Sequence, residues 1–397
     1  MMRLTIFLNK KNLILILFLL TSFIVLKLYS ISFESMPYNV DVLAIFLIFA
    51  ILSVLREKTS LTLIYITWFI ILIFYSPSID PLSSPDALKY YKEAFLDGYY
   101  KTKGFYDIIN GHLPVIETTA GIIKLISFSF SSNSLVLIVS LNVIILIESS
   151  YIFVNLLRLK FKISNLAYYS SLLALCFSPA ILNLSFILQK DIYVYFLSII
   201  FLYLFDRLIN KKNISTFILI TITVLIGTLI RLYYPLIIVC YLSLLFYNSK
   251  VIIRFAVTLF ILYFLFFILF LKGSIVDIFF GIASITSTPN FLRSINWEEH
   301  PLMTIESCLI SFFIALSLLK VIQYRRFLFT FIFIMLFAGA TLVGVSQNRV
   351  ISDSNFTQTS SLLSDNMTRK KVPYVPLLIT FIVISFSITN QRTKNHG

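Results

Sequence analysis

The chain has 397 residues, of which 59% are hydrophobic and 13% are charged, and its mean hydropathy is +0.94. This composition excludes a water-soluble globular protein and predicts an all-α, polytopic integral membrane protein. The apolar runs are continuous and do not alternate, which excludes a β-barrel. The formal net charge is +14. In a membrane protein an excess of lysine and arginine usually indicates which loops are cytoplasmic, so we predict no nucleic-acid partner.

Apolar runs predict about twelve transmembrane helices in a single membrane domain, residues 1–397. The first run follows Arg3, Lys10 and Lys11 and has no small-residue cleavage site, so we expect it to remain as a membrane helix. The three cysteines are isolated in apolar runs, and neither a disulfide framework nor a zinc site is expected from them. The predicted spans are residues 12–29, 40–55, 60–76, 134–157, 165–186, 191–208, 214–230, 232–248, 252–271, 303–320, 327–345 and 373–390.

Residues 114–130 decide the topology, because they are apolar but interrupted by polar side chains. If they form a juxtamembrane helix on the outer face, eighteen of the 32 lysines and arginines fall in short cytoplasmic segments. Only Glu57 and Asp206 are acidic there, which satisfies the positive-inside rule. We therefore predict that both termini are cytoplasmic. Three outer loops are then long enough to carry function: 77–133, 272–302 and 346–372.

Any chemistry is expected at the outer face. The inner loops are too short for a nucleotide-binding domain, and none of the 10 glycines stands in a phosphate-binding loop. Neither ATP nor a nucleotide-sugar is found outside the cell membrane, so an energy-rich substrate would have to be lipid-linked. We predict no cofactor and no His/Cys metal cluster, and leave a role for a divalent metal open.

The first outer loop contains the stretch Ser84-Pro85-Asp86-Ala87-Leu88-Lys89-Tyr90-Tyr91. Pro85 favours the first position of a helix, and Asp86 would then lie in the first turn, where the ionised carboxylate is favoured. Asp86 is the candidate catalytic residue, as a general base or a metal ligand. The alternative is an ordinary carboxylate at a helix start. Tyr90 is a candidate sugar contact.

Charged residues also occur between apolar runs on the predicted outer side. Lys190 and Asp191 have almost no loop around them, so they are expected to be functional or to form an ion pair at the interface. Arg231 lies between two runs without a polar linker, and Pro235 allows a break there. An arginine in this place could bind phosphate oxygens with its planar guanidinium, or it could snorkel to lipid headgroups.

The two later outer loops supply further candidates. Arg349 and the run Arg369-Lys370-Lys371 before Pro373 form a basic cluster that runs against the positive-inside trend. The cluster suggests a diphosphate or anionic-glycan site or, alternatively, contact with anionic lipid. Trp297 is a candidate sugar-stacking platform or an interface anchor. Glu306, one turn into the next span, is expected to have a partner such as an arginine.

These features together resemble two known kinds of protein. They are the lipid-dependent glycosyltransferases of the GT-C fold and the polysaccharide repeat-unit polymerases of the Wzy type. The similarity rests on layout over residues 80–390. Its elements are the early outer Asp86, Phe177-Ser178-Pro179, Lys190-Asp191, Ile230-Arg231, Asn348-Arg349 and Arg369-Lys370-Lys371. The acidic loop follows the third span and no large outer domain follows the last span, which is closer to the polymerases.

The resemblance implies a multi-pass protein of the bacterial inner membrane that polymerises O-antigen or capsular repeat units. It implies undecaprenyl-diphosphate-linked oligosaccharide as substrate, membrane lipid as surroundings, and a chain-length regulator protein as a further partner. It also implies that outer-face arginines handle the diphosphate. Two alternatives stay open: a GT-C enzyme that adds one sugar from a polyprenyl-phosphate donor, and a flippase for lipid-linked oligosaccharide.

Overall fold

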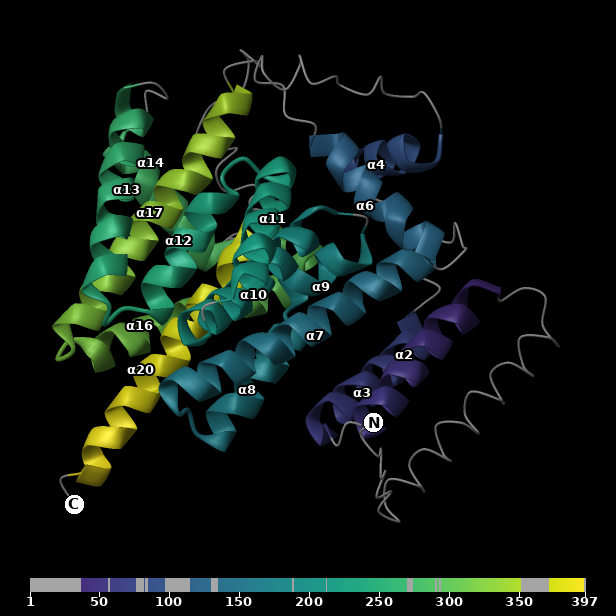
Figure 1. The fold of residues 1–397 in the computed structure, drawn as a ribbon, viewed down its shortest axis with the longest axis horizontal. Helices are drawn as coiled ribbons and strands as arrows, with labels where there is room; N and C mark the ends of the chain where they lie inside the picture. The colour runs from purple at the N-terminus through teal and green to yellow at the C-terminus, as the bar shows by residue number, and fades with distance from the viewer. Residues whose placement is uncertain are drawn as a thin grey trace. The chain divides into compact units, whose positions relative to one another are not determined.

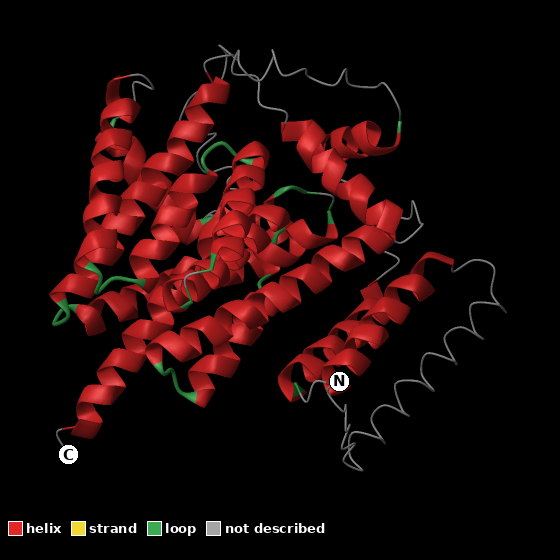
Figure 2. Cartoon of the chain, viewed as in Figure 1, coloured by secondary structure: helices red, strands yellow, loops and turns green. Residues whose placement is uncertain are grey.

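The computed structural model describes residues 37–55, 58–75, 82, 85–96, 115–129, 135–187, 189–211, 213–269, 274–289, 291–292, 294–350 and 371–395. Within these ranges every regular element is a helix, and Figure 2 shows only helices and connecting loops there, which confirms the all-α prediction. The predicted span 12–29 lies outside the described residues.

Six of the described helical stretches are long and apolar enough to cross a membrane, as judged by length and composition. They are Ile138–Phe161, Asn165–Leu182, Asp191–Asn210, Lys250–Leu269, Pro301–Val321 and Arg325–Val343. Shorter apolar helices cover most of the other predicted spans. These helices are those of an α-helical membrane protein, and the total of about twelve spans stays a prediction.

The chain divides into two compact units. The first comprises residues 1–102, 119–151 and 185–189. Its helices α2 (Pro37–Leu55) and α3 (Thr59–Tyr75) pack side by side, with the ring of Tyr65 against Phe46 and Phe49 (Figure 1). The Tyr65 hydroxyl donates a hydrogen bond of 2.9 Å to Glu148 on α7 (Leu135–Phe161), which satisfies that carboxylate inside an apolar bundle.

Two helices predicted from the polar outer loop are present. The helix that was expected to begin at Pro85 is α4 (Pro85–Phe95), and the helix expected at 114–130 is α6 (Val115–Ser129). The fixed backbone angle of Pro85 and its missing N–H suit a first helical position. Ser83 and Ser84, the expected caps, lie outside the described residues. The position of α6 at a membrane face stays a prediction.

The second unit comprises residues 103–118, 152–184 and 190–397 and contains most of the remaining helices. Its core is aromatic: Phe327 stacks on Phe381, and the buried Tyr241 donates a hydrogen bond of 2.8 Å to the carbonyl oxygen of Pro373. The helices are α8 (Asn165–Cys176), α9 (Pro179–Phe186), α10 (Asp191–Asn210), α11 (Ile214–Ile230), α12 (Tyr234–Leu245), α13 (Lys250–Leu269), α14 (Ile275–Ser287), α15 (Ser294–Glu299), α16 (Pro301–Val321), α17 (Arg325–Val350), η2 (Val372–Tyr374) and α20 (Val375–Asn395).

Helix α14 was not predicted, because residues 272–302 were taken as a loop. Its 13 residues are apolar but too few to cross a bilayer. A capping box begins it, in which Ser274 and Asp277 satisfy each other's backbone N–H groups. The helix lies along α17 (Figure 1), and the absence of side chains at Gly281 and Gly339 lets the two backbones touch.

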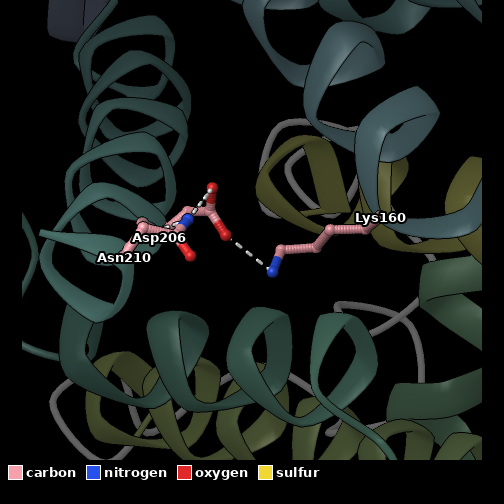
Figure 3. A network of polar contacts seen from close by, with 3 residues as sticks. All are labelled: Lys160, Asp206 and Asn210. Atoms are coloured by element: carbon pink, nitrogen blue, oxygen red, sulfur yellow. Dashed lines mark hydrogen bonds and ion pairs between the residues drawn. The ribbon is translucent and has the colours of Figure 1, made fainter.

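Several of the connections that were predicted to be cytoplasmic lie together at one end of the second unit. Lys160, at the end of α7, forms an ion pair of 2.7 Å with Asp206 near the end of α10, and Asn210 donates to the same aspartate (Figure 3). Tyr247 packs against Phe161 and Phe327 at the same end. Asp206 lies fifteen residues after Asp191 on α10, about 22 Å along the helix axis. The predicted topology, including which end of the unit faces the cytoplasm, stays a prediction.

Candidate functional site

The candidate site lies at the other end of the second unit, where charged side chains from distant parts of the chain converge. Asp191 begins α10, Arg231 follows α11, Glu306 lies in the second turn of α16, and Lys371 precedes η2. Three contacts join these elements: Arg231 with Asp191, Glu306 with the start of α9, and Lys371 with the segment after α14. All four positions belong to segments that were predicted at the outer face.

Arg231 and Asp191 form a buried ion pair. The Nε of Arg231 donates to Asp191 Oδ1 at 3.1 Å, and its Nη2 donates to the same oxygen. The side chain of Asp191 is 1% exposed and that of Arg231 is 13% exposed. Arg231 thus points into the protein and not toward lipid headgroups, which argues against snorkelling. Asp191, which was considered as the partner of Lys190, is paired with a residue forty positions later.

Helix ends hold this pair in place. Arg231 has extended backbone angles and ends α11, while Pro235 helps to begin α12 two residues after the turn. Asp191 is the first residue of α10. A carboxylate is favoured at a helix N-terminus and a cation at a helix C-terminus, so both charges are stabilised by the backbone dipoles as well as by each other. Lys190, the residue before α10, is also buried.

The second carboxylate oxygen of Asp191 is unsatisfied among the described residues. Asp191 Oδ2 is buried and accepts no hydrogen bond there. A charged oxygen without a donor is costly in an apolar bundle, and native structures contain few such atoms. The site therefore presents an acceptor that a hydroxyl group of a ligand could satisfy.

A close packing contact supports the turn that carries Arg231. A side chain on Gly227, one turn before the end of α11, would fall within 2.7 Å of three ring atoms of Tyr234. The ring of Tyr234 therefore lies directly on the backbone of α11. Tyr233 lies under the guanidinium of Arg231, with the ring centre 5.6 Å from the central carbon.

Glu306 stabilises a break in the chain between α8 and α9. Its two oxygens accept hydrogen bonds from the Ser178 hydroxyl at 2.5 Å and from the Ala180 N–H at 2.9 Å. Pro179 interrupts the helix, and the backbone N–H groups that this break releases need acceptors. Glu306 was expected to have a partner such as an arginine. Among the described residues its partners are the Ser178 hydroxyl and a helix N-terminus.

Lys371 is fully buried, and its ammonium group donates to the carbonyl oxygen of Thr288. Burial lowers the pKa of Lys371, and the negative charge of Glu306 raises it again. The sequence had placed Lys371 at the end of a basic surface cluster and had not selected it. Its position directly before the apolar run that starts at Val372 was the only sequence signal for an inward side chain.

Replacing Glu306 with glutamine is expected to lower the free energy of unfolding by about 2 kcal/mol at pH 7, because the Ala180 N–H loses its charged acceptor.

The same substitution removes the negative charge near Lys371, so the pKa of Lys371 falls further below 10.5. Between that lowered pKa and 10.5, Lys371 keeps its proton in the unfolded chain but has lost it in the folded chain. The free energy of unfolding therefore rises with pH in this range. Thermal unfolding in detergent should therefore show a deficit that shrinks as the pH rises. The exposed Glu298→Gln is the matched control and should show no deficit.

The remaining candidates are distributed over both units. Asp86 is half-buried in the first turn of α4, and Tyr90 lies one turn later on the same helix, in the first unit. The ring of Tyr90 is 2% exposed, which argues against a role as a sugar-stacking surface. Trp297, on α15 of the second unit, is 44% exposed, and its indole N–H donates to the carbonyl oxygen of Phe291 at 2.8 Å. Its exposed ring face fits either a sugar platform or an interface anchor.

The predicted basic cluster is only partly described. Arg349 lies in the last turn of α17, and its side chain is outside the described part of the structure, as are Arg369 and Lys370 altogether. Among the described residues, no three His, Cys, Asp or Glu side chains lie close enough to hold a metal ion together.

Comparison with known proteins adds no relative to this picture: no protein-family model, no curated protein and no solved structure matches the chain.

Proposed function

We propose that this chain is a glycosyltransferase that polymerises polyprenyl-diphosphate-linked oligosaccharide repeat units, of O-antigen or capsule, at the outer face of a bacterial inner membrane. The observation that carries the proposal is the buried pair of Arg231 and Asp191 at the junction of α10, α11 and α12. An intramembrane ion pair of this kind is retained at a cost in stability, which makes a functional site the first hypothesis.

A diphosphate on a lipid carrier has to be recognised where the membrane meets the outer aqueous phase. Arginine suits this task because its planar guanidinium stays charged and matches two phosphate oxygens at once. Asp191 fixes the orientation of the Arg231 guanidinium, and Lys190, the residue before Asp191 in the chain, is a second buried basic residue in this part of the unit. Bound in this way, the diphosphate is stabilised as a leaving group.

The unsatisfied Asp191 Oδ2 supplies the second part of the recognition. A hydroxyl group of a sugar would donate to it and remove the cost of the unpaired oxygen. An acyl chain offers no such donor, so this oxygen favours a ligand that carries sugar hydroxyls next to its phosphate groups. Lipid-linked oligosaccharides combine the two.

In the proposed reaction, a hydroxyl of the terminal sugar of one lipid-linked repeat attacks the anomeric carbon of a second glycan. The new glycosidic bond forms as the bond between that carbon and the diphosphate oxygen breaks. Asp86 accepts the hydroxyl proton, and the polyprenyl diphosphate leaves with the electron pair. Asp86 lies in the first unit and the pair of Arg231 and Asp191 in the second.

Gel analysis of surface polysaccharide from a deletion strain, with and without the restored gene, tests the proposed function. A polymerase is indicated if the long-chain ladder disappears and a single repeat unit remains. A ladder with an altered step size would instead indicate a transferase that adds one sugar. Loss of every repeat, with lipid-linked units accumulating inside, would indicate a flippase. An unchanged profile would contradict all three.

Replacing Asp86 with asparagine is expected to abolish the ladder at normal protein level, since the amide cannot accept the hydroxyl proton. General-base catalysis typically contributes about 10²–10⁴-fold in rate, so the remaining polymer should be undetectable by gel. Glu117→Gln is the matched control, because Glu117 is also a half-buried carboxylate in the first turn of an outer helix, α6. A normal ladder from the Asp86 variant would remove this residue from the mechanism.

A further inference from the structure

A cavity of about 580 Å³ opens at the end of the second unit opposite to Asp191. Three segments line it: the end of α7 with the residues after it (Lys160, Phe161, Lys162), the connection of α12 to α13 (residues 245–249), and α20 at Ile384 and Ser387. This volume lies within the range of about 300–1,000 Å³ found for small-molecule sites. The proposed reaction at the other end of the unit makes no use of it.

The charged side chains of the cavity are both lysines. Lys160 is held in place, since its ammonium group pairs with Asp206 (Figure 3) and lies 3.9 Å from the ring centre of Phe246. Lys162 is exposed, and no ion pair joins it to an acidic residue within the described part of the chain. None of the lining residues is acidic, and Lys160 is already paired with Asp206, so Lys162 supplies the positive charge that a ligand could balance.

The neighbouring walls supply polar and apolar contacts. Asn248 and Ser249 provide amide and hydroxyl groups, and the turn that carries them is fixed by a hydrogen bond of 2.8 Å from the Ser249 N–H to the Phe246 carbonyl oxygen. Phe161 stacks on Tyr247 with ring centres 6.3 Å apart, and Leu245 and Ile384 complete an apolar side. A ligand with a charged polar end and an apolar remainder would match these walls.

From these contacts we propose that the cavity binds a phosphate group, with Lys162 as its counter-charge and Lys160, Asn248 and Ser249 as hydrogen-bond donors. Basic pockets between membrane helices on the cytoplasmic side are suited to phosphate-bearing headgroups. The phosphate can come from an anionic glycerophospholipid or from a free phosphate ester. Because it contacts α7, the α12–α13 turn and α20 together, its binding stabilises the arrangement of these three segments.

Lys162 can be replaced so that its charge is lost while its backbone conformation is kept. Its backbone has a φ of 49°, in the left-handed region, which asparagine tolerates better than most residues. Lys162→Asn therefore removes the charge without backbone strain. Lys211→Asn is the matched control, because Lys211 is also an exposed lysine at a helix end but does not line the cavity.

The test is thermal unfolding of the purified full chain in neutral detergent, with added phosphatidylglycerol, phosphatidylcholine or free glycerol 3-phosphate. We expect phosphatidylglycerol to raise Tm by several degrees, and Lys162→Asn to lower the apparent affinity at least fivefold while Lys211→Asn does not. If phosphatidylglycerol alone raises Tm, the ligand is a lipid headgroup. If glycerol 3-phosphate raises Tm as well, the phosphate ester is sufficient for binding.

Equal stabilisation by phosphatidylcholine, no stabilisation by either anion, or an unchanged response of Lys162→Asn would overturn the proposal. None of these readouts depends on polymer synthesis.

Discussion

Replacing Asp191 with asparagine is expected to abolish the polysaccharide ladder and to destabilise the protein at the same time. The variant keeps the shape of the side chain but leaves the guanidinium of Arg231 largely buried without its counter-charge. Breaking a buried ion pair from one side costs about 3–5 kcal/mol, because the remaining charge is uncompensated. Thermal unfolding in detergent and gel analysis of surface polysaccharide measure the two effects.

The double variant Asp191→Asn/Arg231→Gln separates stability from function. With both charges removed, no uncompensated ion remains, and the free energy of unfolding should return to within about 1 kcal/mol of the parent chain. The ladder should nevertheless stay absent, because glutamine cannot balance the charge of a diphosphate. A double variant that polymerises normally would show that the pair serves only the fold.

Replacing Gly281 with alanine is expected to have the largest effect on folding among single-methyl changes in the described helices. A Cβ at this position would lie 2.3 Å from the carbonyl oxygen of Gly339 and 2.8 Å from its Cα. Neither atom belongs to a side chain that could turn away, so α14 and α17 would have to separate. Overpacking of this kind costs about 3 kcal/mol, and the variant should show a lower Tm and a lower yield in the membrane.

The control for this change is Gly121→Ala on α6. A Cβ there meets no atom within 4 Å, so no packing penalty opposes it. Alanine also favours helix by about 1 kcal/mol over glycine. The Gly121 variant should therefore unfold at an equal or slightly higher temperature. Equal destabilisation by both alanines would contradict the close approach of α14 and α17.

Local composition was sufficient to place most helices. The run at 214–230 coincides with α11, and 60–76 differs from α3 by one residue at each end. A continuous apolar run in a membrane has to satisfy its backbone N–H and C=O groups internally, and a helix does so. Helix α14 was missed because it is too short for a span and contains Asp277. The spacing of Ser274 and Asp277, which form its capping box, was the overlooked signal.

The partners of the charged residues could not be predicted in the same way. Glu306 caps α9 across 126 residues, and Asp191 reaches Arg231 across 40, so each contact depends on how helices pack and not on local pattern. The sequence singled out Asp191, Arg231 and Glu306 as costly charges, and each of the three has a polar partner inside the second unit. It did not show which charged side chain or backbone group is the partner of each of them.

The pairing of Asp191 with Arg231 also determines how α10 and α11 can move. The two helices form a hairpin that the chain itself joins at one end, through residues 211–213, and that the ion pair joins at the other. The hairpin is therefore a closed loop with one covalent and one breakable link. The ion pair therefore fixes the spacing between the start of α10 and the end of α11, at the end of the hairpin where the chain itself does not join them.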